Sequence, residues 1–252
     1  MPTTSAQLVE DPIGRFPHAT VACFDPTCGE LPRRRLDEPR TVAYLERLAA
    51  AGAGGLLIAS STGQGHLRTV EELGAWFQCA ARASVSEAVR MALLRPEDGE
   101  VVNRRLLDRL QELGYPVVFF RPGTNLPSDA SDESVVDSLV PLVSAAAERG
   151  LAVGLYSIPD VSGLPLTPAA SAMLLDSSGG DHIVAIKVTE RDYSASTERF
   201  LAHPKLRRLK IVQGWDPHLA RALRDGPRFD ERGRPRAGIT SGVMAFAVLQ
   251  YQ

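Results

Sequence analysis

The 252-residue chain has only three cysteines, at positions 23, 28 and 79. Three irregularly spaced cysteines cannot build a disulfide framework, and CFDPTC does not have zinc-finger spacing. The chain also lacks eighteen consecutive apolar residues, and its start, MPTTSAQLVEDPIGRF, lacks the basic head and apolar segment of a signal peptide. We therefore expect free thiols and a cytoplasmic protein without a membrane partner.

A basic excess is also missing, because the formal net charge is −2 and the pI is near 6.2. Proteins that bind nucleic acids or anionic membranes depend on such an excess to neutralise phosphates, so neither partner is expected. Hydrophobic residues make up 44% of the chain and charged residues 23%, which is typical of a globular protein with a substantial core.

Lysine is the scarcest of the charged residues, since only three of the 28 basic residues are lysines. One of them lies in the apolar, β-branched stretch HIVAIKVTE, residues 182–190. Such a stretch predicts a buried strand, where an ammonium group is costly to desolvate. The position of this lysine therefore needs a chemical explanation.

Short apolar runs alternate with amphipathic segments along the whole chain, which predicts βα units and a parallel sheet. Two helices are indicated over 38–52 and 100–114, each ending at a glycine, and a third after residue 131 that Pro141 could kink. Eight strands are expected, over 19–24, 54–60, 89–95, 116–121, 151–157, 182–189, 209–214 and 237–243.

Eight strands separated by helices favour a closed (β/α)8 TIM barrel over an open doubly wound sheet. We expect residues 1–252 to form this single α/β domain, with 1–16 as a flexible N-terminal segment. Only MAFAVLQYQ follows the last strand, so the eighth helix is nearly missing. The bottom of the barrel would then stay partly uncovered unless another subunit covers it.

Counting by two along the sixth predicted strand places Ile183, Ala185, Lys187 and Thr189 on one face and Val184, Ile186 and Val188 on the other. If the branched residues of the other face pack against helices, Lys187 points into the barrel near its C-terminal mouth, where such folds keep their active sites. Apolar walls favour the neutral amine, which can attack a carbonyl to form a Schiff base. The alternative is a structural ion pair with Glu190 or Asp216.

Two other segments reach the same rim. Tyr156, in GLYSIPDVSG, lies one strand away from Lys187 and could relay protons, although a rim tyrosine can also simply cap the core. The turn ASSTGQGHL offers backbone amides and the hydroxyls of Ser61 and Thr62, which suit an anion the size of a carboxylate. Each signal is weak when taken alone.

Together and in this order, the segments SSTGQ (60–64), YSIP (156–159) and IKVT (186–189) resemble the dihydrodipicolinate synthase/N-acetylneuraminate lyase family of class I aldolases. VQGWDP (212–217) and GITSGV (238–243) are similar to the family's turn after strand seven and its eighth strand. The likeness extends from about residue 17 to the C-terminus.

The resemblance implies a carbon–carbon lyase that needs no cofactor or metal and takes a 2-oxo acid such as pyruvate together with an aldehyde. Lys187 would form the imine and Tyr156 would shuttle protons. The family usually carries helices after the eighth strand, an extension missing here, and it forms homo-oligomers, which we also expect. Substrate would be bound by Ser61, Thr62 and Gly63 on one side and by Gly238, Thr240 and Ser241 on the other.

Three departures from the family pattern keep the reaction open. Val161 stands where dihydrodipicolinate synthases carry an arginine, VVFFRPGT lacks their tyrosine pair, and MALLRPEDG replaces a small-residue turn. A Schiff-base dehydratase or hydratase acting on a sugar-derived 2-oxo acid is one alternative. The other is a barrel that has lost catalysis and acts as a binding protein.

Overall fold

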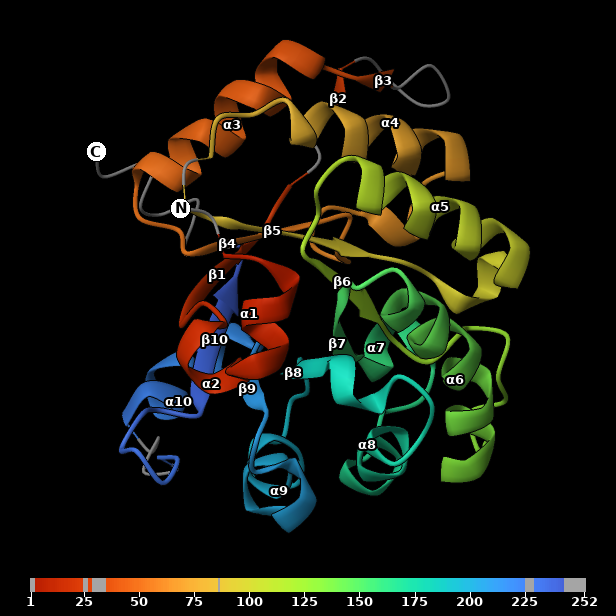
Figure 1. The fold of residues 1–252 in the computed structure, drawn as a ribbon, viewed down its shortest axis with the longest axis vertical. Helices are drawn as coiled ribbons and strands as arrows, with labels where there is room; N and C mark the ends of the chain where they lie inside the picture. The colour runs from red at the N-terminus through yellow and green to blue at the C-terminus, as the bar shows by residue number, and fades with distance from the viewer. Residues whose placement is uncertain (1–2, 25–26, 29–34, 86, 225–228, 243–252) are drawn as a thin grey trace.

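The computed structural model describes residues 3–24, 27–28, 35–85, 87–224 and 229–242. Its centre is a closed barrel of eight parallel strands, ordered β1-β10-β9-β8-β7-β6-β5-β4 around the ring (Figure 1). The predicted (β/α)8 TIM barrel is confirmed, with every strand inside its expected range. The strands are β1 (Ala19–Ala22), β4 (Gly55–Ile58), β5 (Val89–Leu93), β6 (Val117–Phe120), β7 (Ala152–Ser157), β8 (Ile183–Val188), β9 (Lys210–Gln213) and β10 (Ala237–Ser241).

Helices surround the barrel, and α3, α4, α6 and α8 begin at side-chain caps. Asp37 accepts the Arg40 N–H at the start of α3, and Thr69 and Glu72 form a capping box at the start of α4. The α-helices described after β1 are α3 (Glu38–Ala50), α4 (Val70–Ala81), α5 (Glu100–Glu112), α6 (Asp132–Glu148), α7 (Pro159–Ser162), α8 (Pro168–Leu175), α9 (Thr197–Ala202) and α10 (Leu219–Arg224).

Two details of the helices were open in the sequence. The predicted glycine stops lie just past the ends of α3 and α5, where Gly52 and Gly114 adopt positive φ. Helix α6 runs through Pro141 for 17 residues, and buried Leu139, Leu142 and Val143 flank the proline. A short two-stranded sheet pairs β2 (Thr27–Cys28) with β3 (Arg35–Leu36). Segment 244–252, for which we expected a nearly missing eighth helix, lies outside the described residues.

Strand residues alternate between an outer core under the helices and an inner core inside the barrel. On β8, Ile186 and Val188 belong to the outer core and Ala185 to the inner one, as the predicted alternation requires. Ile183 and Val184 depart from it, Ile183 joining the outer core and Val184 the inner one, because the β7–β8 register shifts between Val153 and Gly154. The irregularity lies at the start of the strand, so it leaves the face of Lys187 unchanged.

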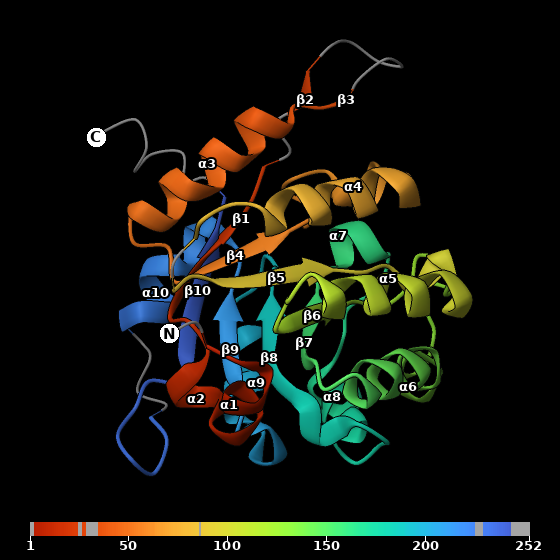
Figure 2. The ribbon, with the colours of Figure 1, turned by 45° about the horizontal axis from the view of Figure 1, so that its top comes forward.

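The N-terminal segment forms two helices that close the bottom of the barrel, α1 (Ser5–Glu10) and α2 (Pro12–Arg15). Leu8 is fully buried in the inner core, and the ring of Phe16 meets that of Phe119 edge-on at a centroid distance of 6.3 Å. Ser5 Oγ donates to the Pro116 carbonyl at 2.9 Å. Figure 2 shows both helices, in red, beside β8, and α1 also contacts β7.

We expected segment 1–16 to be flexible, but residues 5–16 form packed helices. The chain itself therefore covers the barrel bottom. The Thr4–Gln7 capping box and Asp11, whose side chain accepts the Gly14 N–H, stabilise helices that are too short to form alone. Burial of Leu8 and Phe16 provides the tertiary contact that such short helices require.

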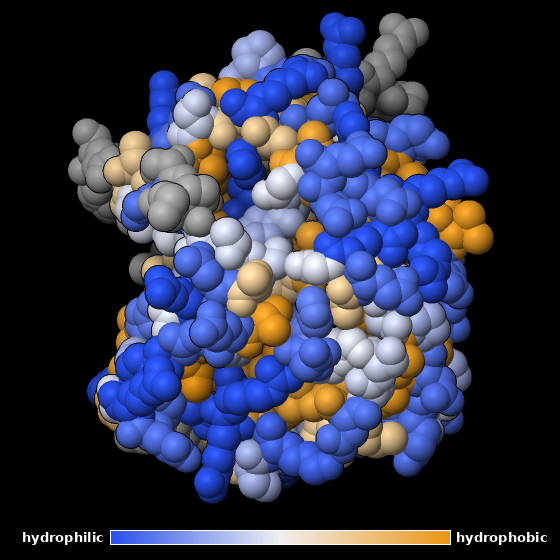
Figure 3. All heavy atoms as spheres, viewed as in Figure 1, coloured by the Kyte–Doolittle hydropathy of each residue, from blue (hydrophilic) through white to orange (hydrophobic). Residues whose placement is uncertain are grey.

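Polar side chains dominate the outer surface. In Figure 3 the apolar residues of the visible face form small groups between hydrophilic ones. The large apolar side chains that the described residues expose are scattered over separate elements, as with Leu67, Val101 and Leu223. Among the helices of the described ranges, none has the length and apolar composition needed to cross a lipid bilayer.

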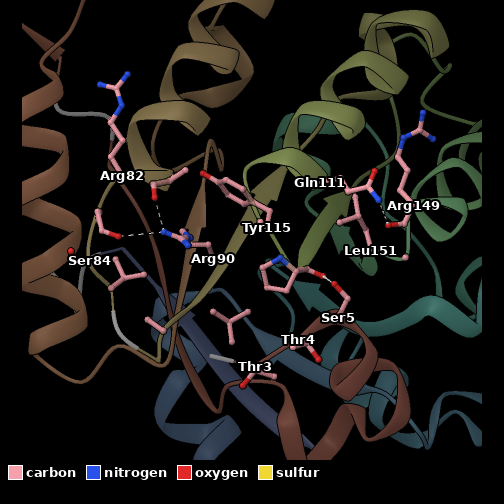
Figure 4. Close-up of a pocket in the computed structure, with 18 residues that line it drawn as sticks. Thr3, Thr4, Ser5, Arg82, Ser84, Arg90, Gln111, Tyr115, Arg149 and Leu151 are labelled. Carbon is pink, nitrogen blue, oxygen red and sulfur yellow. Dashed lines mark hydrogen bonds between the residues drawn. The ribbon is translucent and has the colours of Figure 1, made fainter. Parts of the chain in front are cut away.

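A hollow of about 640 Å³ lies at the bottom face between Thr3–Ser5 and the loops that precede β5, β6 and β7 (Figure 4). Its arginines are bonded to the chain itself. Arg90 Nη1 donates to the carbonyls of Ala81 and Ala83 at 3.0 and 3.3 Å, and Arg149 Nη1 donates to the Ala145 carbonyl at 2.7 Å. These bonds tie the lower loops together.

Lys210 is a second buried lysine, at the start of β9, with a side chain only 2% exposed. Its ammonium group donates to the Pro235 carbonyl at 2.8 Å. The pKa of Lys210 is lowered to about 8. Burial is the main cause, and the charge of Arg234 also lowers the pKa, while Asp230 raises it by less. The folded protein therefore holds this proton less tightly than the unfolded chain does.

We expect stability to rise with pH because of Lys210. Between pH 8 and the ordinary lysine pKa of 10.5, the unfolded chain binds more protons than the folded protein, so raising the pH favours folding. From pH 7.5 to 9.5 this group should add about 2 kcal/mol to the free energy of unfolding. Urea unfolding at both pH values should show the gain in the wild type and its loss in Lys210→Met. Equal pH dependence in both proteins would contradict the prediction.

Candidate active site

A cavity of about 270 Å³ opens at the C-terminal mouth of the barrel, the end at which (β/α)8 enzymes carry their active sites. Its walls come from the ends of five strands and from the turn after β4. The lining residues are Ala22, Ser61, Thr62, Tyr156, Lys187, Thr189, Gly214, Trp215, Asp216, Pro217, Thr240 and Gly242.

Lys187 lines this cavity with a side chain that is only 2% exposed. Its Nζ donates to the Tyr156 hydroxyl at 3.0 Å and lies 4.2 Å from the centre of the tyrosine ring. The two residues are direct partners in the β7–β8 ladder, which fixes their side chains next to each other. Strand pairing therefore sets the amine–phenol geometry.

The described residues do not support the ion-pair alternative for Lys187. Glu190 accepts a hydrogen bond from Ser157 Oγ at 2.6 Å, and Ser157 Oγ also accepts the Leu166 N–H at 3.0 Å. Burial raises the pKa of Glu190, against the effect of the Ser157 bond. Within the described ranges, no carboxylate lies within 4.0 Å of Lys187 Nζ, so its polar partner there is the Tyr156 hydroxyl.

Tyr156 also approaches the turn after β4. Its hydroxyl lies 3.4 Å from Ser61 Oγ, so Lys187, Tyr156 and Ser61 form a chain of polar groups along the cavity wall. Such a chain can pass a proton between the amine and a bound molecule. Its three members come from three separate segments of the sequence.

The turn after β4 is tightly folded. Ala59 and Gln64 adopt left-handed backbone conformations, and the amides of Gln64 and Gly65 donate back to the carbonyls of Ser61 and Ser60 at 2.9 and 3.0 Å. A side chain at Gly65 would collide with the Ala59 carbonyl, so glycine is required there. This compact turn directs the side chains of Ser61 and Thr62 into the cavity.

The structure brings five of the eight predicted site residues to the cavity, namely Lys187, Tyr156, Ser61, Thr62 and Thr240. Gly63, Gly238 and Ser241 lie elsewhere. Gly63 packs against the Cys23 carbonyl and the Trp76 ring. A Cβ added to Gly63 would lie only 2.7 Å from that ring.

The placement of Gly238 and Ser241 follows from the geometry of β10. Gly238 shares the inner face with Thr240 but lies one layer lower, beside the His18 carbonyl and Lys210. Ser241 shares the outer face with Ile239, which packs against Leu219 of α10. Strand alternation thus separates them from the cavity.

Sequence reasoning assigned no role to Thr189 and Gly214, which also line the cavity. Thr189 Oγ1 is buried without a hydrogen-bond partner. A Cβ at Gly214 would collide with this hydroxyl and lie 2.8 Å from Lys187 Cε, so only glycine leaves room for both side chains. The period-two count had already placed Thr189 on the face of Lys187, which was the available signal.

Trp215 forms part of the cavity wall. The guanidinium carbon of Arg191 lies 5.8 Å from the centre of its indole ring, and Arg191 also pairs with Asp160 at 3.3 Å. These contacts link the loops after β7, β8 and β9. Among the described residues, no group of three histidine, cysteine or carboxylate side chains is arranged to hold a metal ion.

Comparison with known sequences gives no match, either to a protein-family model or to a curated protein. Solved structures do match. A prophage protein from Escherichia coli, belonging to the dihydrodipicolinic acid synthase family and solved in complex with pyruvate, aligns with a TM-score of 0.76 at 21% identity. The alignment covers 92% of this chain and 72% of the prophage protein.

Two further structures give the same result. N-acetylneuraminate lyase from Mycoplasma synoviae aligns with a TM-score of 0.74 at 16% identity, over 94% of this chain and 73% of the lyase. Dihydrodipicolinate synthase from Agrobacterium tumefaciens aligns with a TM-score of 0.72 at 19% identity, over 92% and 75% of the two chains. This chain therefore has the barrel fold of these proteins.

Proposed function

We propose that this chain, built on the barrel fold of the dihydrodipicolinate synthase and N-acetylneuraminate lyase proteins, is a class I aldolase that makes or breaks a carbon–carbon bond of a 2-oxo acid. The observation that carries the proposal is the buried amine of Lys187 in a cavity, 3.0 Å from the Tyr156 hydroxyl. A buried amine without a carboxylate partner suits a nucleophile better than a structural ion pair.

The proposed reaction begins when the neutral Lys187 amine attacks the keto carbon of the 2-oxo acid. The resulting carbinolamine loses water to give an imine, and the Tyr156 hydroxyl delivers the proton that the departing oxygen needs. The protonated imine then accepts the electron pair of the breaking carbon–carbon bond, while the Tyr156 oxygen, which gave up its proton in the previous step, takes the proton of the substrate hydroxyl; this yields an enamine and releases an aldehyde. Protonation of the enamine and hydrolysis return the free amine and the shortened 2-oxo acid.

The carboxylate of the 2-oxo acid would bind at the turn after β4. Ser61 and Thr62 direct their side chains to the cavity beside Tyr156, and Thr240 lies on another part of its wall. Hydroxyl and amide donors of such a turn suit a carboxylate. At about 270 Å³ the cavity is near the lower end of ligand pockets, which favours a small 2-oxo acid such as pyruvate.

Borohydride trapping tests the proposal. Wild-type protein incubated with pyruvate and reduced with borohydride should gain about 72 Da, the mass of pyruvate less water plus two hydrogens, as measured by intact-mass spectrometry. Samples lacking either reagent should not change mass. The absence of an adduct with pyruvate and a panel of other 2-oxo acids would contradict imine chemistry and favour a non-catalytic binding barrel.

Product analysis then separates an aldolase from a dehydratase or hydratase, because both classes form the imine. An aldolase yields two carbon fragments from one substrate, whereas a dehydratase keeps all carbons together and releases water. Incubation with sugar-derived 2-oxo acids, followed by mass spectrometry of the small molecules, distinguishes these outcomes. Release of pyruvate with an aldehyde would support the proposed aldolase.

A further inference from the structure

Arg95, just after β5, extends across to the turn that precedes α4. Its side chain is buried, and the residue is 8% exposed. Nη1 donates to three main-chain carbonyls of that turn, at 3.2 Å to Gly65, 3.3 Å to His66 and 2.7 Å to Arg68. One guanidinium group thus bonds to the main chain of three residues of the turn.

The remaining donors of Arg95 fix its own position. Nε and Nη2 donate to the two carboxylate oxygens of Asp98 at 2.8 and 2.9 Å, a bidentate pair that is among the stronger interactions of side chains. Asn103 Nδ2 donates to the Arg95 carbonyl at 2.8 Å and to the Gly99 carbonyl at 2.9 Å. Arg95 is therefore anchored before it reaches the turn.

The same segment is fastened on its other side to β6. Arg121, which follows β6 and is almost fully buried, donates to both carboxylate oxygens of Glu97. The ladder pairs Phe120 of β6 with Leu155 of β7, one residue before Tyr156. Residues 95–98 thus connect the turn that carries Ser61 with the part of the barrel wall next to Tyr156.

Ladder pairing cannot hold this turn in place, because β4 ends at Ile58 and the turn begins beyond it. Arg95 supplies bonds from outside the turn, in addition to those that the turn makes within itself. Catalytic and binding groups must be held within a fraction of an ångström, and a displacement of about 1 Å can cost on the order of 100-fold in rate.

We infer that Arg95 is a positioning residue that holds the turn so that Ser61 and Thr62 meet the substrate carboxylate and Ser61 stays within reach of Tyr156. This inference rests on the proposed function, since it assigns the turn to carboxylate binding. Arg95 does not line the cavity, so its effect is exerted through the turn.

The test compares Arg95→Met with Arg90→Met. Arg90 lies on β5, the strand that Arg95 follows, and its guanidinium also donates to two main-chain carbonyls, but at the opposite end of the barrel, where Figure 4 shows it. The pyruvate concentration that gives half-maximal borohydride trapping should rise about tenfold or more in Arg95→Met, with the yield at saturation retained. It should be unchanged in Arg90→Met.

Arg95→Lys and Asp98→Asn serve as further variants if Arg95→Met does not fold. Lysine keeps the charge without the planar fork, and asparagine removes the charge that anchors Arg95, so both should also raise the half-maximal concentration. Folded variants at position 95 or 98 with the wild-type pyruvate dependence would overturn this inference and leave the proposed function intact. Failure of the wild type itself to trap any 2-oxo acid would overturn both.

Discussion

Replacement of Lys187 by alanine should abolish the pyruvate adduct and lower any aldolase turnover by at least about 10⁴-fold, because the only group that forms the covalent bond is removed. The loss should not prevent folding. The side chain is buried with a phenol as its polar partner in the described structure, so the substitution removes a desolvated polar group together with its methylenes. Intact-mass spectrometry after borohydride reduction measures the adduct, and thermal unfolding confirms the fold.

The other two lysines provide matched controls for this result. Lys205 is exposed and paired with Asp176 at 2.5 Å, and Lys210 is buried at the bottom of the barrel. Lys205→Ala and Lys210→Met should both retain the adduct. Since the chain has only these three lysines, peptide mapping assigns the modified position directly. An adduct that persists in Lys187→Ala, or that maps to Lys210, would refute the nucleophile assignment.

Replacement of Tyr156 by phenylalanine should slow turnover by about 10²- to 10⁴-fold, the usual contribution of a positioned proton donor. The ring remains to pack in the inner core, but the hydroxyl that lies between Lys187 and Ser61 is lost. Imine formation should continue at a reduced rate, because the amine is still present. The time course of borohydride trapping at saturating pyruvate measures the slow step, and steady-state assays measure the loss of turnover.

Tyr115→Phe is the matched control for removing a buried phenol. Its hydroxyl donates to the Phe77 carbonyl at 2.9 Å, away from the cavity, so the variant should lose about 1 kcal/mol of stability and keep the wild-type trapping rate. If Tyr156→Phe trapped pyruvate as fast as the wild type, Tyr156 would be a packing residue of the rim.

The barrel and the position of Lys187 could be predicted because both depend on local patterns. Eight apolar runs of strand length specify the strands. Period-two alternation places Lys187 on the face of β8 that points away from Ile186 and Val188, which pack under the helices. Tyr156 is paired with Lys187 because parallel strands of similar length reach the rim together. The catalytic roles of these residues, the homo-oligomer and the cytoplasmic location stay predictions.

Other features depend on contacts between distant parts of the chain, which sequence patterns do not contain. Residues 5–16 contain no long apolar run, and Leu8 becomes a core residue only because the barrel bottom offers it an inner core. The GITSGV segment suggested Gly238, Thr240 and Ser241 as site residues, but alternation and depth leave only Thr240 of these three at the cavity, together with Gly242 of the same segment. Arg95 lies in the MALLRPEDG segment, which departs from the family pattern, and only its three carbonyl partners on the turn reveal what it holds.

The helix pair α1–α2 has a consequence for the order of folding during synthesis. Ser5 bonds to Pro116, and α1 and α2 contact strands that end as late as Val188. These helices leave the ribosome before the strands that they contact, so their docking surface is complete only after most of the barrel has been made. Contacts of such large sequence separation form late because of the loop-closure entropy. The first helices of the chain are thus expected to be among the last parts to reach their native place.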